Sequence, residues 1–231
     1  MTINRLLTTV LNKYPSGILV VGGRPFSMSP EAASVHFWSA TSPEEKSRVL
    51  NDFPRQTWYG PTANLVDDQV VTCYEDSCRV LKDGAWEHLA QTRVARRHHS
   101  STVYKGRVLL IGGEDTLSTE WISLDGSPPE EGPFQLPGNH GKGHCTIKVS
   151  PDVIVVTGGW NGKSPSWTSR SYNLGTGAET NVGKMFVRRY MHACGVYEDA
   201  SHRQVRTVSF LFLLRPKLLS ILGHIFKLSS T

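Results

Sequence analysis

The chain of 231 residues has only four cysteines, few charged residues and no long hydrophobic run. Its longest apolar run, residues 208–214, is about a third of the ~20 residues that a membrane-spanning helix needs. The first 21 residues show neither an unbroken apolar segment nor a small-residue cleavage site, so we expect no secretory signal and no membrane span. With 39% hydrophobic and 19% charged residues, the chain is typical of globular rather than disordered proteins.

Acidic residues are absent after Asp199, and this absence explains the net charge of +5. The first 199 residues are neutral, since the excess comes from five basic residues: Arg203, Arg206, Arg215, Lys217 and Lys227. A pI of about 9.1 therefore does not indicate a nucleic-acid-binding domain, and we expect no nucleic-acid partner.

Sequence motifs of the common catalytic sites are also absent. The chain has no Gly-x-Ser-x-Gly elbow, no phosphate-binding Gly-x-x-x-x-Gly-Lys-Ser/Thr loop and no His-Glu-x-x-His metalloprotease motif. We therefore expect no enzyme activity, no catalytic residues and no cofactor.

The few cysteines leave the compartment open. Cys73 and Cys78 flank a predicted four-residue hairpin loop, so they can face each other across two strands. They form a disulfide in an oxidising compartment, or they are two half-buried thiols in a cytosolic protein. We expect a cytoplasmic protein, or an extracellular one if the cysteines are paired.

Four short β-branched runs recur along the chain, and each ends in a glycine pair or its counterpart. Each run is too short for a helix and is typical of a buried strand. The runs are ILVVGG at 18–23, QVVTCY at 69–74, VLLIGG at 108–113 and VIVVTGG at 153–159. The equivalent positions Gly22, Cys73, Gly112 and Gly158 are 51, 39 and 46 residues apart, close to the ~40–50 residues of a propeller blade.

A histidine before an apolar run repeats with the same period. His144 follows His99 by 45 residues, and His192 follows His144 by 48. We interpret the three as one structural position rather than as metal ligands, because equivalent residues of separate repeats do not gather on one ion. A metal site of these histidines with Cys145 is therefore not expected. Cys145 and Cys194 follow their histidines closely and give a second possible disulfide.

The order of these marks resembles the kelch repeat of β-propellers over roughly residues 17–197. The pattern is Arg-x-x-His, an apolar strand, a second apolar strand with Gly-Gly, and then a strand carrying an aromatic residue. The clearest repeat has Arg96, His99, Gly112, Gly113 and Trp121, and the next has His144, Gly158, Gly159 and Tyr172. The resemblance implies an all-β toroid of four-stranded blades whose loops form a binding face.

We therefore predict a kelch-type β-propeller of about four and a half blades over residues 1–204. The residues expected to have repeat-structural roles are Gly22, Gly23, His99, Gly112, Gly113, His144, Gly158, Gly159 and His192. No glycine pair follows Tyr197, and residues 205–231 are predicted to form a basic apolar tail, helical over 217–228 or irregular. An open blade exposes an apolar face and unpaired edges, so self-association is also expected.

The loops that carry basic and aromatic residues are the predicted partner-binding surface. Arginines precede the innermost strands, while Trp160 and Asn161 follow a glycine pair. The predicted contact residues are Arg96, Arg97, Trp160, Asn161, Arg188 and Arg189. We interpret the chain as a non-catalytic protein-interaction module or scaffold with a protein partner. The alternative is a fragment of a secreted carbohydrate-active or oxidase-type propeller, which disulfides and glycan binding would favour.

Overall fold

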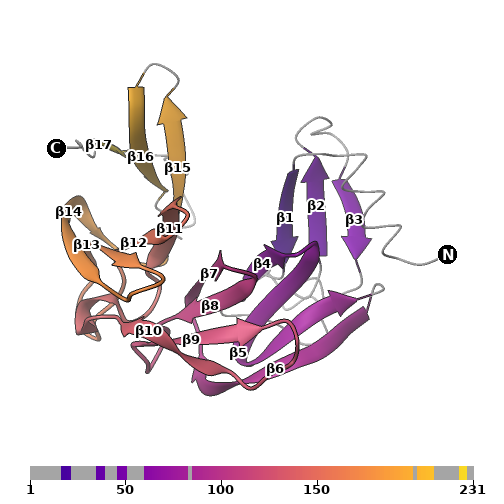
Figure 1. The fold of residues 1–231 in the computed structure, drawn as a ribbon. Helices are drawn as coiled ribbons and strands as arrows, with labels where there is room; N and C mark the ends of the chain where they lie inside the picture. The colour runs from indigo at the N-terminus through magenta and orange to yellow at the C-terminus, as the bar shows by residue number, and fades with distance from the viewer. Residues whose placement is uncertain are drawn as a thin grey trace. The chain divides into compact units, whose positions relative to one another are not determined.

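The computed structural model describes residues 17–21, 35–39, 46–50, 60–82, 85–199, 202–210 and 224–227 (Figure 1). These residues form antiparallel strands, joined by turns and by one short 3₁₀ helix, η2 (Gly138–His140). The predicted all-β class is confirmed. None of the helical segments within these ranges is long and apolar enough to cross a membrane. Gly22 and Gly23 lie outside the described residues.

The chain divides into two compact units, residues 1–97 with 123–129, and residues 98–122 with 130–231. The first unit has two three-stranded sheets. One sheet contains β1 (Gly17–Val21), β2 (Val35–Ser39) and β3 (Lys46–Leu50). The other contains β4 (Thr62–Val66), β5 (Gln69–Lys82) and β6 (Ala85–Arg96).

Strand β5 folds back on itself, as the predicted hairpin requires. Its Cys73 and Cys78 have Cα atoms 4.1 Å apart, whereas five residues of extended strand span ~17 Å. Glu75 lies between them in the left-handed region, with φ 51°. The first half of β5 pairs with β4 and the second half with β6, so this sheet contains four extended segments.

The second unit contains two four-stranded sheets and one three-stranded sheet. The first is formed by β7 (Ser100–Tyr104), β8 (Arg107–Ile111), β9 (Ser118–Ser123) and β10 (Glu130–Gln135). The second is formed by β11 (Cys145–Ser150), β12 (Val153–Thr157), β13 (Ser166–Asn173) and β14 (Glu179–Arg189). In both sheets, neighbouring strands follow chain order. The third is formed by β15 (Ala193–Asp199), β16 (His202–Phe210) and β17 (His224–Lys227).

The first strands of the three sheets, β7, β11 and β15, lie side by side. The two four-stranded sheets share one core, to which β8, β9 and β10 contribute from one side and β12 and β13 from the other. The rings of Phe134 and Tyr172 stack across it with centroids 4.2 Å apart. The predicted β-branched runs form β8 and β12, in which four of five residues are buried. Both faces of these strands are covered by protein, which explains their continuous apolar sequence.

The predicted helix of the C-terminal tail differs from the structure. Strand β16 includes residue 205 and pairs with β15. The helix predicted over 217–228 is wrong at His224–Lys227, which pairs as β17 with β16. Pairing with β16 provides backbone hydrogen bonds there, whereas a helix of about 12 residues is marginal by itself in water.

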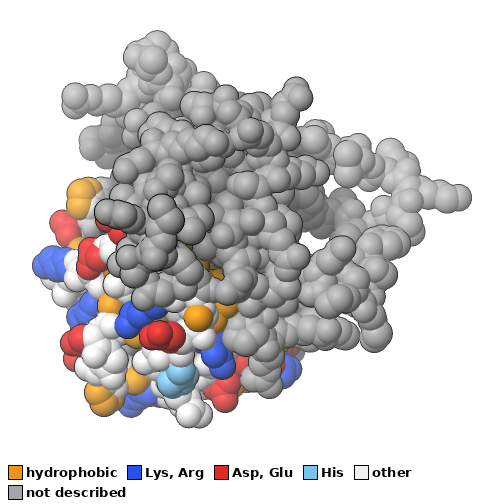
Figure 2. All heavy atoms as spheres, turned by 90° about the vertical axis from the view of Figure 1, so that its right-hand side faces the viewer, with side chains coloured by type: hydrophobic (Ala, Val, Ile, Leu, Met, Phe, Trp, Pro, Cys, Tyr) orange, Lys and Arg blue, Asp and Glu red, His pale blue; other side chains and the backbone are white. Residues whose placement is uncertain are grey.

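On one face of the molecule, the described side chains do not separate by charge. On the face drawn in Figure 2, basic, acidic and apolar side chains lie interspersed among the coloured atoms. This mixture agrees with the neutral sum of residues 1–199.

Candidate binding site on the loop face

The histidines and glycines of the repeat contact each other between neighbouring sheets. Gly112 directly follows β8 and has φ +57°, and a Cβ atom there would lie 2.9 Å from His144 Cε1. Gly158 directly follows β12 and has φ +64°, and a Cβ atom there would lie 2.6 Å from His192 Cε1. Each histidine therefore occupies space that only a glycine of the preceding repeat leaves open.

Main-chain hydrogen bonds hold the same loops together. The Gly113 N–H donates to Gly141 O (3.0 Å), and the equivalent Gly159 N–H donates to Arg189 O (2.9 Å). A second series connects the residues that directly precede the repeated histidines. Gly143 N–H donates to His98 O (2.9 Å), and Met191 N–H donates to Gly143 O (2.6 Å). We call this end of the second unit, residues 112–117, 136–144, 158–165 and 190–192, the loop face.

Burial keeps His144 and His192 neutral near pH 7. Desolvation lowers the pKa of His144 to about 3 and the pKa of His192 to about 4. Their Nε2 atoms lie 2.8 Å from Ser100 Oγ and 3.0 Å from Thr157 Oγ1, respectively. His99 is buried at the equivalent position before β7. These side chains are buried in the protein, so they cannot exchange protons readily with a ligand at the surface.

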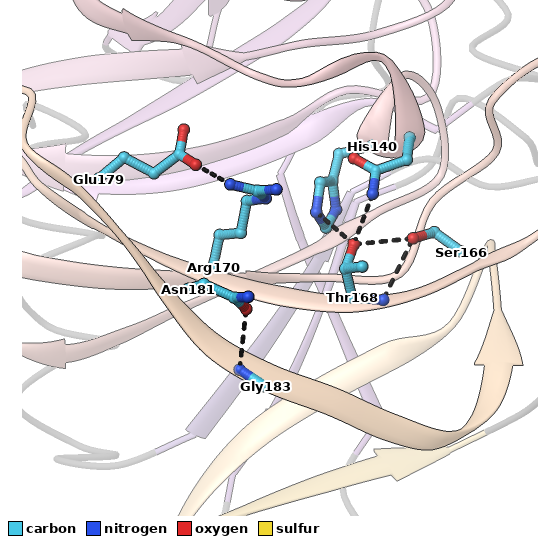
Figure 3. Close-up of polar contacts among 8 residues, drawn as sticks. His140, Ser166, Thr168, Arg170, Glu179, Asn181 and Gly183 are labelled. Atoms are coloured by element: carbon cyan, nitrogen blue, oxygen red, sulfur yellow. Dashed lines mark hydrogen bonds and ion pairs between the residues drawn. The ribbon is translucent and has the colours of Figure 1, made fainter.

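A further buried histidine, His140 in η2, organises a polar network that the sequence did not reveal (Figure 3). Its Nδ1–H donates to Gly158 O at 2.6 Å, which leaves Nε2 to accept from Thr168 Oγ1 at 2.8 Å. Asn139 Nδ2 donates to the same hydroxyl oxygen at 2.9 Å. Burial lowers the pKa of His140 to about 4. His140 is not one of the residues that recur with the period of the repeat. The sequence feature that could have drawn attention to it is its position four residues before His144.

Three loops of the loop face line an open pocket of about 370 Å³. Residues 113–117 follow β8, residues 138–142 precede β11, and residues 160–162 follow β12. The loop after β12 is held in shape by Asn161, whose Oδ1 accepts hydrogen bonds from the backbone N–H groups of Lys163 and Ser164. The pocket is thus formed by fixed loops of two neighbouring sheets.

The pocket combines an aromatic wall with charged groups. The backbone N–H of Trp160 donates to Lys142 O (2.9 Å), and the Trp160 ring lies against the Tyr190 ring with centroids 5.0 Å apart. Lys142 Nζ forms an ion pair with Glu114. Asp115, the third charged residue of the lining, is exposed and has φ +66°.

Strands β13 and β14 present an exposed tryptophan that is flanked by two basic side chains. Trp167 in β13 has Arg188 Cζ 4.5 Å and Lys184 Nζ 5.0 Å from its ring centroid. Arg188 Nη1 also donates to Ser164 Oγ at 3.3 Å, which connects β14 to the loop after β12. This arrangement leaves Trp167 39% exposed.

The predicted contact residues do not form one surface. Trp160 and Asn161 line the pocket, and Arg188 is exposed beside Trp167. Arg97 is exposed in the first unit, where its Nε donates to Glu75 Oε1 at 2.8 Å. Arg96 and Arg189 are only 1% and 4% exposed, so their predicted role as surface contacts is wrong. Both side chains are turned into the protein, which the Arg-x-x-His spacing alone could not reveal.

All four cysteines are paired. Cys73 forms a disulfide with Cys78, and Cys145 in β11 forms a disulfide with Cys194 in β15. The expectation of a cytoplasmic protein is therefore not supported, because disulfides persist mainly in oxidising compartments. Among the described side chains, residues 60–82 and 85–195, no group of three His, Cys, Asp or Glu residues is arranged to hold a metal ion.

Comparison with known proteins identifies the fold. No protein-family model matches the chain, and no curated protein has a matching sequence. The solved structure of YjhT is similar over 76% of this chain, with a TM-score of 0.58 and 9% sequence identity. The match spans 66% of the YjhT chain. This similarity supports a propeller-like all-β fold.

Proposed function

We propose that the chain is part of a kelch-type β-propeller that binds a protein partner through its loop face, without catalysis. The observation that carries this proposal is the pocket lined by Trp160, together with the exposed Trp167 and with Arg188, which donates to Ser164 of the loop after β12. Tryptophan and arginine are the residues most enriched at the energetically dominant positions of protein interfaces. The loops are already held by main-chain hydrogen bonds, and such preorganisation lowers the entropic cost of binding.

The assignment to kelch repeats is supported by the contacts of the repeated residues. The first glycine of each described pair accommodates the histidine of the next sheet, at Gly112 with His144 and at Gly158 with His192. A recurring contact of this kind explains why the glycine and histidine marks keep the same period. It gives the sequence resemblance a physical basis.

A non-catalytic role is supported by the state of the best candidate acid–base groups. His140, His144 and His192 are buried and their pKa values are lowered by desolvation, to about 4, about 3 and about 4. General acid–base catalysis works best when the pKa lies near the working pH and the group reaches the substrate. These histidines meet neither condition.

The two disulfides support an oxidising, extracellular location. The same disulfides, together with a tryptophan in a pocket, favour the second candidate function, carbohydrate binding by a secreted propeller. Self-association through an exposed blade edge stays a prediction.

The proposal is tested by comparing variants of the full chain, expressed through a secretory pathway, as bait in extracellular fluid. We expect quantitative mass spectrometry to find a protein that wild type retains and Trp160→Ala retains about tenfold less, as for a hot-spot residue. Leu65→Ala is the matched control, because Leu65 is a 52% exposed apolar residue of the first unit. Identical retention by all three proteins would contradict the proposal. A glycan array signal that Trp160→Ala removes would favour the carbohydrate function instead.

A further inference from the structure

The geometry points to a specific occupant of the loop-face pocket: the side chain of an arginine supplied by the protein partner. This inference rests on the proposed protein-binding function and specifies its chemistry. The pocket, at about 370 Å³, lies at the small end of the ~300–1,000 Å³ of ligand sites, which suits a single inserted side chain.

The charges of the lining favour a cation. Three charged residues line the pocket, and two of them, Glu114 and Lys142, form an ion pair with each other. The Asp115 carboxylate then leaves the lining with a net negative charge. An anionic ligand would be repelled by this carboxylate, whereas a guanidinium can donate two parallel hydrogen bonds to it.

The aromatic wall favours the same occupant. The backbone of Trp160 is held by its hydrogen bond to Lys142 O, and its ring packs against Tyr190 with centroids 5.0 Å apart, so part of the ordering cost of binding is already met. A guanidinium is planar and weakly hydrated, and it stacks on an indole face more favourably than a lysine ammonium does.

The protein itself shows how an arginine fits between a tryptophan and a carboxylate. Arg107 in β8 has Cζ 4.8 Å from the centroid of Trp121, while its Nη1 donates to Glu130 Oε2 at 2.7 Å. The pocket offers the same two groups, an indole and a carboxylate. None of the described residues that line it is an arginine. We infer that an arginine from the partner completes this combination.

The experiment uses the full chain and three capped tripeptides, Gly-Arg-Gly, Gly-citrulline-Gly and Gly-Glu-Gly. Citrulline keeps the shape of arginine and removes its charge. NMR titration follows the Trp160 indole N–H signal, identified by its loss in Trp160→Phe. We expect the arginine peptide to bind at least ~10-fold more tightly than the citrulline peptide, the value of about one good charge-assisted contact. The glutamate peptide should not bind.

Asp115→Asn is the diagnostic variant, because asparagine tolerates the positive φ of this position and removes only the charge. Asp115→Asn should lower the affinity for the arginine peptide about tenfold, whereas Asp68→Asn should leave this affinity unchanged because the charge-assisted contact persists. Asp68 is a matched control, since it is exposed in the first unit with φ 61°. Equal affinities for arginine and citrulline, or an unchanged affinity in Asp115→Asn, would overturn the inference. If partner retention still depends on Trp160 in that case, the proposed function stands and only the arginine occupant is wrong.

Discussion

At the scale of single residues, the glycine pairs are explained by what lies beside them. Gly158 has Arg189 O and His192 Cε1 at 2.5 and 2.6 Å from the position of a Cβ atom. Gly126 has a similarly positive φ, +78°, but no atom within 4 Å of that position. Comparing the two positions therefore distinguishes the cost of the left-handed backbone from the cost of a steric clash with a new Cβ atom.

Alanine at these positions should have unequal effects on the free energy of unfolding. Gly126→Ala is expected to cost ~1 kcal/mol, from the left-handed backbone alone. Gly158→Ala should cost ~1–3 kcal/mol more, because backbone or ring must move to admit the methyl group. Urea denaturation of the full chain measures both. Equal losses would show that the contact with His192 is not the reason for the glycine.

The buried histidines predict that acid destabilises the protein well above the pH at which carboxylates protonate. Burial lowers the pKa values of His140, His144 and His192 from 6.5 to about 4, about 3 and about 4. Between pH 6.5 and 4 the unfolded chain binds protons that the native chain does not, so stability falls as the pH falls. Each histidine contributes at most ~1.4 kcal/mol per pH unit.

The measurement is the urea midpoint at pH 7 and at pH 5. His192→Gln should reduce the difference between the two midpoints, while His88→Gln should leave it unchanged because His88 is exposed. A midpoint independent of pH would contradict the account of the histidines.

At the scale of strands and sheets, the Cys145–Cys194 disulfide has an equivalent in the preceding repeat. Ser100 directly follows His99 as Cys145 follows His144, and Thr146 is two residues after His144 as Cys194 is two residues after His192. Ser100 Oγ and Thr146 Oγ1 lie 2.5 Å apart. The same position between adjacent inner strands is thus occupied once by a hydrogen bond and once by a disulfide.

This equivalence predicts that Ser100→Cys combined with Thr146→Cys forms a third disulfide, since the side chains are already directed at each other. Ser101→Cys with Thr146→Cys is the control, because successive residues of a strand, such as Ser100 and Ser101, point to opposite faces. Peptide mass mapping after air oxidation detects the bond. Equal cross-linking of both pairs, or none in the first, would contradict the equivalence.

The strands themselves were largely predictable, while the pocket was not. Residues 108–111 and 153–157 are predicted as buried strands and form β8 and β12. Apolar runs of this length, bounded by turn residues, are too short for a helix and favour a buried strand. The pocket combines loops that start at residues 113, 138 and 160 and depends on how the sheets pack. Spacing likewise could not show that Arg96 and Arg189 turn inward.

At the scale of the whole molecule, the spacing of the repeated glycines and histidines said more about the fold than overall sequence identity to a known structure does. A propeller-like fold was predicted from glycine and histidine spacing, and it agrees with a structure that shares only 9% of its sequence. Composition was less informative about compartment, because four cysteines are compatible with thiols or disulfides until their strands are placed. Their pairing follows from the hairpin and from adjacent inner strands.

The central claim is that the loop face of the second unit binds a protein. It is tested most directly by hydrogen exchange of the full chain, with and without the partner retained through Trp160. The account predicts slower exchange at residues 113–117, 138–142 and 160–165 and no change in β4, where the exposed Leu65 lies. Protection confined to β4 and its neighbours, with unchanged exchange in the three loops, would contradict it.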